Sequence, residues 1–141
     1  MVDAMPLVSI DLILVRHGRE VLLGLRNNRP ALGCWFVPGG RILKGEAIEA
    51  ARARIIRREL GDVVPLDGWS LLGAYDHMYT DNFAGAPDVT THYVVLGYRL
   101  EVIGDGPAVQ ADDQHESLQW VDIAQALRRS DVHDNTKAYL R

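Results

Sequence analysis

The chain has 141 residues, of which 48% are hydrophobic and 24% charged, a balance typical of one globular domain. No apolar run approaches the roughly 20 residues that span a bilayer, and the N-terminus lacks the basic start and long apolar stretch of a signal peptide. A net charge of −4 argues against a general polyanion binder, because non-specific nucleic-acid affinity needs a basic surface. We expect a soluble cytoplasmic protein, a single domain over residues 1–141.

The N-terminal part of the chain predicts two strands and a loop. Residues 7–15 are rich in Val, Ile and Leu, as in a largely buried strand, and Gly18 turns the chain into a second strand over residues 20–25. Residues 26–33 contain Asn, Pro and Gly, which predicts a loop. The single cysteine, Cys34, excludes an intrachain disulfide and a cysteine-based zinc site, and it fits a reducing compartment.

The next segment predicts a helix. A short apolar piece, residues 35–37, leads into a Pro-Gly-Gly sequence. Residues 46–60 contain no Gly or Pro and many Ala, Arg, Ile and Glu, which favours a helix. Gly61 follows where a helix C-terminus favours a left-handed residue.

The rest of the chain predicts further strands and a second helix. Residues 71–79 and 90–102 have the pattern of strands, separated by a polar loop, and residues 117–121 that of a last short strand. Asp122 is placed to cap a helix that runs to residue 129, and residues 135–140 form a terminal turn or helix. This order predicts an α/β sandwich and not a doubly wound parallel sheet.

The sharpest motif lies on the predicted central helix and the loop before it. Gly40 is followed after five residues by Glu46, after a further seven by Arg54, and then by Glu59 and Gly61. This spacing resembles the Nudix box, G-x5-E-x7-R-E-U-x-E-E-x-G-U, in which U is a bulky apolar residue. The resemblance implies a Nudix hydrolase with an α/β/α sandwich around a mixed central sheet.

Three positions depart from the box. Ile55 and Arg58 stand where the family has glutamates, and Asp62 replaces the final apolar residue. Glutamates one helical turn apart can hold several Mg²⁺ ions for hydrolysis at phosphorus. Here that face is reduced to Glu59, which predicts a single metal. Either the enzyme is degenerate or its reaction needs less metal.

The same departure is found in one Nudix subgroup that the chain resembles, the GDP-mannose mannosyl hydrolases, which cleave the bond between sugar C1 and oxygen. The resemblance covers nearly the whole chain. Its specific pieces are residues 28–31, 35–41, 81–83, 90–97 and 114–115.

The subgroup resemblance implies three oxygen donors for Mg²⁺: the backbone carbonyl of Gly39, the carboxylate of Glu59 and the side chain of Gln114, with substrate diphosphate completing the shell. All are hard donors, which Mg²⁺ prefers. The alternative for Glu59, which we favour less, is an ordinary surface glutamate of the helix. Taken without the resemblance, Gln114 is an ordinary loop residue.

The resemblance also implies the proton acceptor. His115 matches the general base that deprotonates the water attacking C1, and an imidazole with a pKa of about 6.5 suits that task. His77 matches a pocket histidine and is the second candidate for a catalytic role. His17 and His133 are expected to be surface residues.

Other residues match substrate contacts of the subgroup. Arg26 matches the arginine that stabilises the GDP leaving group, and Arg41 a second phosphate contact; both could instead serve loop solvation and carbonyl capping. Asp11 could bind a sugar hydroxyl or be a buried aspartate satisfied by backbone. Tyr93 matches a substrate-contacting tyrosine, and core packing explains it equally well.

Three further residues concern the box loop and the phosphate site. Glu46 and Arg54 are expected to brace the loop and orient Glu59. Asn27 stands where relatives often carry a basic residue, so one phosphate contact is expected to be missing.

The resulting hypothesis is Mg²⁺-dependent hydrolysis of GDP-mannose to GDP and mannose, with inversion at the anomeric carbon. Other GDP-sugars such as GDP-glucose fit the sequence as well, and the subgroup implies a homodimer. Two alternatives stay open: a Nudix pyrophosphohydrolase that cleaves a nucleotide sugar or nucleoside triphosphate at phosphorus, and a non-catalytic module that binds nucleotide sugars.

Overall fold

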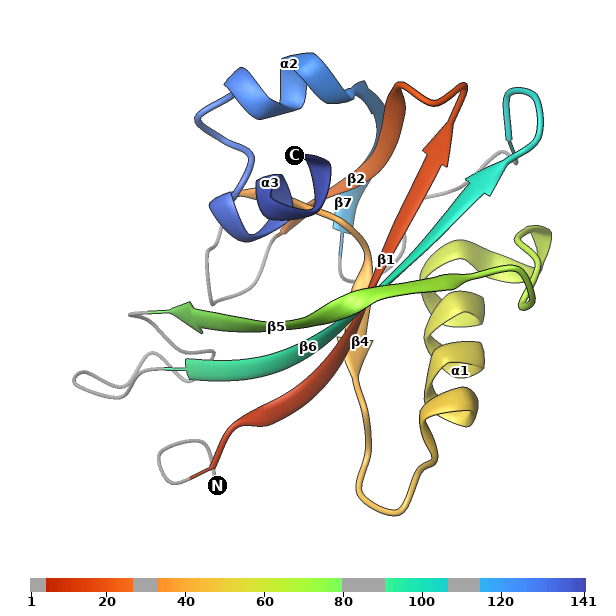
Figure 1. Cartoon of the computed structure of the whole chain (residues 1–141), viewed down its shortest axis with the longest axis vertical. Coiled ribbons are helices and arrows are strands. Elements are labelled where there is room, and N and C mark those ends of the chain that lie inside the picture. The colour runs from red at the N-terminus through yellow and green to blue at the C-terminus, as the bar shows by residue number, and fades with distance from the viewer. Residues whose placement is uncertain (1–4, 27–32, 80–90, 107–114) are drawn as a thin grey trace.

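A mixed β-sheet forms the centre of the protein in a computed structural model, which describes residues 5–26, 33–79, 91–106 and 115–141 (Figure 1). Seven strands make up the sheet within the described residues. They are β1 (Leu7–Arg16), β2 (Glu20–Arg26), β3 (Trp35–Phe36), β4 (Gly39–Arg41), β5 (Ser70–Tyr79), β6 (Thr91–Val102) and β7 (His115–Asp122).

The central strand, β1, has two different partners on one of its edges. On its other edge it pairs in parallel with β6 over its whole length, and β6 pairs antiparallel with β5. The edge of β1 opposite β6 pairs with β2 only at Val15 and Arg16, and with β4 at Ser9 to Asp11. Because β2 turns away from β1 to pair with β3 and β7, the short strand β4 fills the gap. The sheet therefore splits beside Asp11.

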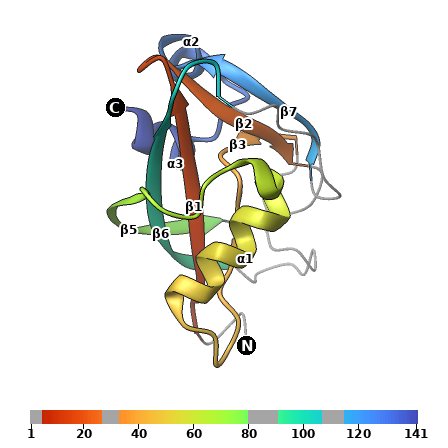
Figure 2. The same ribbon diagram turned by 90° about the vertical axis from the view of Figure 1, so that its right-hand side faces the viewer.

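Helices cover both faces of the sheet. Helix α1 (Ile48–Leu60) lies on one side, and α2 (Ile123–Arg128) and α3 (Asp134–Leu140) lie on the other (Figures 1 and 2). Alternate residues of β1 point to the two sides, so each face has its own apolar cluster: Leu12 packs under α1 and Ile13 under α3. The expected α/β/α sandwich with a mixed sheet is confirmed.

The local sequence explains α1. Its buried residues are Ala51, Ile55, Ile56, Glu59 and Leu60, a spacing that puts all of them on one side of a helix. The helix begins at Ile48, after the predicted start, and Gly61 ends it with a positive φ of 76° while its N–H donates to the Arg57 carbonyl. A 3₁₀ turn (Gly61–Val63) follows.

Strand boundaries differ little from the expected ones, with one exception. The last strand starts earlier, at His115, and the C-terminal turn or helix is a helix. Asp122 caps α2 as expected, since its side chain accepts a 3.1 Å hydrogen bond from the Gln125 N–H. The exception is β4, whose Gly-Gly-Arg sequence carries no strand signal of its own.

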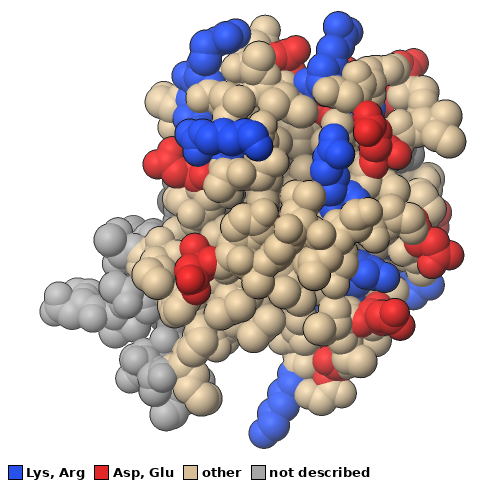
Figure 3. Space-filling view, in the orientation of Figure 1, with Lys and Arg blue, Asp and Glu red and all other residues tan. Residues whose placement is uncertain are grey.

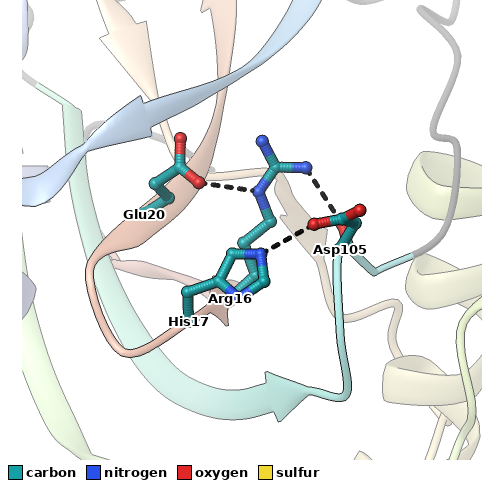
Figure 4. Close-up of polar contacts among 4 residues, drawn as sticks. All are labelled: Arg16, His17, Glu20 and Asp105. Carbon is teal, nitrogen blue, oxygen red and sulfur yellow. Dashed lines mark hydrogen bonds and ion pairs between the residues drawn. The ribbon is translucent and has the colours of Figure 1, made fainter.

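A polar clamp closes the turn between β1 and β2 (Figure 4). Arg16 donates to Glu20 Oε1 and to the carbonyl of Asp105, both at 2.9 Å, and its guanidinium lies 4.5 Å above the Trp120 ring. His17, at a positive φ of 55°, lies 2.9 Å from Asp105 Oδ1. The clamp ties β1 to the segment after β6 at the end of the sheet away from Asp11.

The face that Figure 3 shows carries no basic surface of the kind that binds polyanions. There Lys and Arg side chains alternate with Asp and Glu, and no patch of one sign forms (Figure 3). No helix in the described part of the chain is long and apolar enough to cross a membrane.

Candidate active site

Asp11 is flanked by glycines across the sheet. It pairs with Gly39 of β4 on one side and with Gly97 of β6 on the other, and Gly97 pairs with Gly73 of β5. Neighbouring residues in such a row place their side chains on the same face. On the face that carries α3, the strand neighbours paired with Asp11 therefore bring no side chain beside its carboxylate. We call this glycine-flanked strip, formed by Asp11, Gly39, Gly97 and Gly73, the trough.

Two residues from distant parts of the chain meet Asp11 in this trough. The Tyr139 hydroxyl, from α3, donates a 2.8 Å hydrogen bond to Asp11 Oδ2. The same hydroxyl lies 3.3 Å from Nε2 of His77 on β5, and His77 Nδ1 lies 4.0 Å from Asp11 Oδ2. We call Asp11, His77 and Tyr139 the polar triad. The structure thus brings together two of the predicted substrate-binding residues and adds Tyr139.

Burial shifts both titrating members of the triad toward their neutral forms. Loss of solvent raises the pKa of Asp11 to about 7, against the opposing effects of the Tyr139 hydrogen bond and the charge of Arg26. Burial likewise lowers the pKa of His77, which is 5% exposed, to about 4. Because burial also raises the pKa of Tyr139, its hydroxyl stays protonated and remains a donor. Perturbed carboxyl and imidazole groups in contact are typical of functional sites.

Aromatic rings extend the trough toward β3. His133 stacks on Phe36 at a centroid distance of 4.9 Å, and Tyr79 lies 5.3 Å from His133 and 6.2 Å from Tyr93. The Arg26 guanidinium lies over the Phe36 ring at 5.8 Å. Arg26 and Tyr93, both predicted to contact substrate, therefore border one aromatic cluster that adjoins the polar triad.

His133 differs from its expected surface position. It is half-buried, and besides stacking on Phe36 its Nδ1 accepts a 3.1 Å hydrogen bond from the Asn135 N–H at the start of α3. The sequence around it offers no sign of the Phe36 contact, because that contact depends on how α3 packs on the sheet. His17 is exposed, as expected.

The box loop, residues 42–47 between β4 and α1, is held by one ion pair. Arg54 Nε donates to Glu46 Oε2 at 2.8 Å, and Arg54 Nη2 donates to the Arg41 carbonyl at 2.7 Å. Glu46 Oε1 also accepts from the Leu43 N–H at 3.0 Å. The hydrogen bonds from Arg54 and Leu43 lower the pKa of Glu46 to about 2. The expected brace of the box loop is present, and Arg41 is joined to it through its carbonyl.

Positions 55, 58 and 59, the three glutamate positions of the box that lie in α1, have distinct surroundings. Glu59 is 3% exposed, and Ile55, one turn earlier on the same side of the helix, is 1% exposed. An ideal Cβ on Gly40 would lie 3.2 Å from Cγ1 of Ile55, so this side of α1 packs directly on β4. Arg58 is exposed. Only Glu59 therefore presents a carboxylate on the side of α1 that faces the glycine strand.

The implied metal donors fit this arrangement as far as it is described. A buried carboxylate on the side of α1 that packs on Gly40, and a strand whose Gly39 carbonyl is an oxygen donor, are the hard groups that Mg²⁺ takes. Among the described residues no three His, Cys, Asp or Glu side chains are gathered as a metal site. Gln114 lies outside the described residues. A metal here would depend on carbonyl and amide oxygens as well as on Glu59.

The predicted base and the predicted leaving-group arginine are paired across two neighbouring strands. His115, the first residue of β7, pairs with Arg26, the last residue of β2. The side chain of His115 lies outside the described part of the structure, as do Asn27 and Gln114. The described backbone brings the two segments together beside the split in the sheet.

Tyr139 and Gly97 are the residues that sequence reasoning missed. An ideal Cβ on Gly97 would lie 3.0 Å from Cε1 of Tyr139, so the glycine leaves the space that the ring fills. No local pattern marks this contact.

Comparison with known proteins agrees with this fold and motif. The family model described as NUDIX domain matches residues 5–141. The low-salt glycan biosynthesis protein Agl8 of Haloferax volcanii is 40% identical over 114 residues, which are 81% of this chain and 69% of that protein. ADP-ribose pyrophosphatase of Methanocaldococcus jannaschii is 29% identical over 96% of this chain and 74% of its own length.

A solved structure also places the chain among the Nudix proteins. The MutT NUDIX hydrolase of Burkholderia pseudomallei superposes with a TM-score of 0.71 at 31% identity, and the match covers 96% of each chain. The box spacing, the braced loop, the sandwich and these matches agree, and the chain belongs to the Nudix family of hydrolases.

Proposed function

We propose that this Nudix enzyme hydrolyses GDP-mannose to GDP and mannose by attack of water on the anomeric carbon, with inversion. The observation that carries the proposal is the reduced metal face of α1: Glu59 is a buried carboxylate, whereas Ile55 and Arg58 occupy the other glutamate positions. Attack at phosphorus requires more charge neutralisation than attack at carbon, where the diphosphate departs intact. The name of the Haloferax volcanii relative, a glycan biosynthesis protein, supports a sugar-linked substrate.

In this proposal the residues divide into a sugar side and a phosphate side. Asp11 and His77 bind the sugar in the trough of β1, β5 and β6, and Tyr93 borders it. Arg26 and Arg41 contact the diphosphate, and Arg26 stabilises the charge that develops on GDP as the bond to C1 breaks. His115 takes the proton of the attacking water, and the backbone pairing of His115 with Arg26 supports placing water and leaving group close together.

Nudix hydrolases generally use divalent metal ions. Glu59, the Gly39 carbonyl and Gln114 would hold Mg²⁺, which when bound neutralises diphosphate charge. The Glu46–Arg54 ion pair would act indirectly, by fixing the loop and the helix that carry Gly39 and Glu59.

The alternative is a pyrophosphohydrolase that attacks phosphorus. The observation in its favour is the similarity to an ADP-ribose pyrophosphatase over 96% of the chain. It predicts GMP and mannose 1-phosphate from GDP-mannose, or AMP and ribose 5-phosphate from ADP-ribose.

The deciding experiment is incubation of the purified protein with GDP-mannose and Mg²⁺ in ¹⁸O-labelled water, with the products read by mass spectrometry. The proposal predicts label in free mannose and unlabelled GDP. Label in GMP or in mannose 1-phosphate would establish attack at phosphorus and overturn it. Tight binding without any product would identify a binding module, and parallel reactions with GDP-glucose and ADP-ribose would rank the substrates.

A further inference from the structure

The hydroxyl of Tyr139 joins the C-terminal helix to the strand at the middle of the sheet. It donates to Asp11 Oδ2 at 2.8 Å, although the two residues are 128 positions apart in the chain. The ring that carries it is 9% exposed, and it meets Tyr75 edge-on at a centroid distance of 4.9 Å and 89°. These contacts hold the hydroxyl in one place.

The sheet is built to receive this ring. Asp11 pairs with Gly97, and an ideal Cβ on Gly97 would lie 3.0 Å from the ring of Tyr139 and 3.3 Å from that of Tyr75. A Cβ at 97 would require the Tyr139 and Tyr75 rings to move by a few tenths of an ångström. The glycine therefore allows the hydroxyl to reach the carboxylate.

The two oxygens of Asp11 have different surroundings. Oδ2 accepts the Tyr139 hydrogen bond, whereas Oδ1 lies above Gly39, 2.5 Å from where a Cβ of that residue would be. A carboxylate fixed through one oxygen cannot rotate freely about its last bond. Tyr139 thus fixes the orientation of the carboxylate, with one oxygen on the Tyr139 hydroxyl and the other toward β4, the strand that leads into the box loop.

We propose that Tyr139 is a positioning residue, which fixes the Asp11 carboxylate and the adjacent His77 ring for contact with the sugar of the substrate. This inference rests on the proposed function, which gives Asp11 and His77 that contact. It makes α3 part of the substrate site, and it assigns Gly97 the role of admitting the Tyr139 ring.

The first test compares Tyr139→Phe with wild type. Phenylalanine keeps the ring over Gly97 and removes only the hydroxyl, so the fold is retained. Because the change leaves a buried Asp11 oxygen without its hydrogen-bond donor, we expect about tenfold weaker binding of GDP-mannose. GDP affinity should stay unchanged, because GDP has no sugar to place in the trough. Tyr98→Phe is the matched control, since Tyr98 is a buried tyrosine of β6 on the opposite face, under α1.

A double-mutant cycle separates positioning from general damage. In an Asp11→Ala/His77→Ala background the hydroxyl of Tyr139 has lost both polar partners, so Tyr139→Phe should change GDP-mannose affinity and kcat/KM less than about twofold. Equal losses in both backgrounds, or equal losses for GDP and GDP-mannose, would overturn the inference, because the hydroxyl would then act on stability alone.

A third measurement does not depend on the identity of the substrate. In metal-free protein, the ¹³C resonance of the Asp11 carboxyl and the ¹⁵N resonances of His77 should both shift on Tyr139→Phe and stay in place on Tyr98→Phe. Unchanged resonances would overturn the inference whatever the enzyme hydrolyses. A wild type that neither binds nor hydrolyses GDP-mannose would overturn the proposed function instead; the same variants, tested on the nucleotide derivative it does bind, would then decide the role of Tyr139.

Discussion

Gly39 and Asp11 face each other across β4 and β1 so closely that a side chain at 39 has no room. An ideal Cβ there would lie 2.5 Å from Asp11 Oδ1 and 2.5 Å from the Ile10 carbonyl oxygen. Since one of these atoms belongs to the backbone, rotation of a side chain cannot relieve the overlap.

We predict that Gly39→Ala displaces β4 from β1 and abolishes most of the activity. Gly40→Ala is the matched control, because the atoms nearest to its Cβ belong to the Ile55 side chain, at 3.2 Å, which can shift. Steady-state kinetics and thermal unfolding of both variants test this. An alanine at 39 that left kcat/KM within about threefold of wild type would show that the close approach to Asp11 has no role in the site.

The polar triad makes a second prediction, on stability against pH in metal-free protein. Asp11 has a pKa of about 7 in the fold and 3.8 as a free group, whereas His77 has about 4 in the fold and 6.5 as a free group. Between pH 4 and 6.5 the folded protein holds a proton on Asp11, and the unfolded chain holds one on His77. Both states bind one proton, so this pair leaves the free energy of unfolding nearly independent of pH.

Single substitutions remove that balance. In His77→Gln only Asp11 is shifted, the folded state binds more protons, and stability should rise as the pH falls from 7 to 4. In Asp11→Asn only His77 is shifted, and stability should fall over the pH range from 6.5 to 4. Each change is on the order of 3 kcal/mol. Urea unfolding with EDTA at several pH values measures it, and slopes of the same sign in both variants would contradict the buried neutral pair.

The sequence predicts the local parts of this fold better than the distant contacts. Helix α1 follows from the spacing of its buried residues and from Gly61, both of which act within a few turns. Strand β4 does not follow, because Gly-Gly-Arg has low strand propensity and pairs only where β2 leaves the edge of β1 free. The sequence predicts the Glu46–Arg54 brace, because the box spacing already relates the two residues.

The sequence predicts only part of the trough and of the polar triad. Asp11 stands out as a polar residue in an apolar strand, and the subgroup resemblance points to His77, but nothing local indicates that the two meet. Their contact depends on the parallel pairing of β1 with β6 and on β5 beside it, and Tyr139 reaches them from the other end of the chain. Such contacts are set by tertiary packing rather than by periodicity.

The missing glutamate at position 55 gives a third prediction. Ile55 is buried on the side of α1 that also carries Glu59, so Ile55→Glu should destabilise the metal-free protein by about 2–4 kcal/mol. If this side faces the metal, added Mg²⁺ should restore more stability to the variant than to wild type. Ile56→Glu is the control, since Ile56 is buried in the same apolar cluster, whereas Ile55 is the residue that lies 3.2 Å from a Cβ built on Gly40. Equal Mg²⁺ effects on both variants would place position 55 away from the metal.

The brace of the box loop gives a fourth prediction. Glu46→Gln removes the charge that Arg54 contacts at 2.8 Å, and the loop that leads from Gly39 to α1 should loosen. Because groups that orient a metal ligand typically contribute 10- to 100-fold in metal affinity or activity, we expect weaker Mg²⁺ activation of about that size. Arg57→Ala, an exposed change on the same helix, should leave it unchanged. Mg²⁺ titrations of kcat/KM measure the difference.

The role proposed for His115 gives the fifth prediction. A general base accounts for roughly 10² to 10⁴ in rate, so His115→Gln should lower kcat by at least 100-fold while KM changes little. The matched control is His92→Gln, whose ring pairs with Asp76 on the exposed face of the β5–β6 hairpin, 2.9 Å apart, and which should retain wild-type turnover. A His115→Gln rate within about threefold of wild type would show that another group accepts the proton. His77, whose lowered pKa keeps it neutral at physiological pH, would then be the next residue to replace.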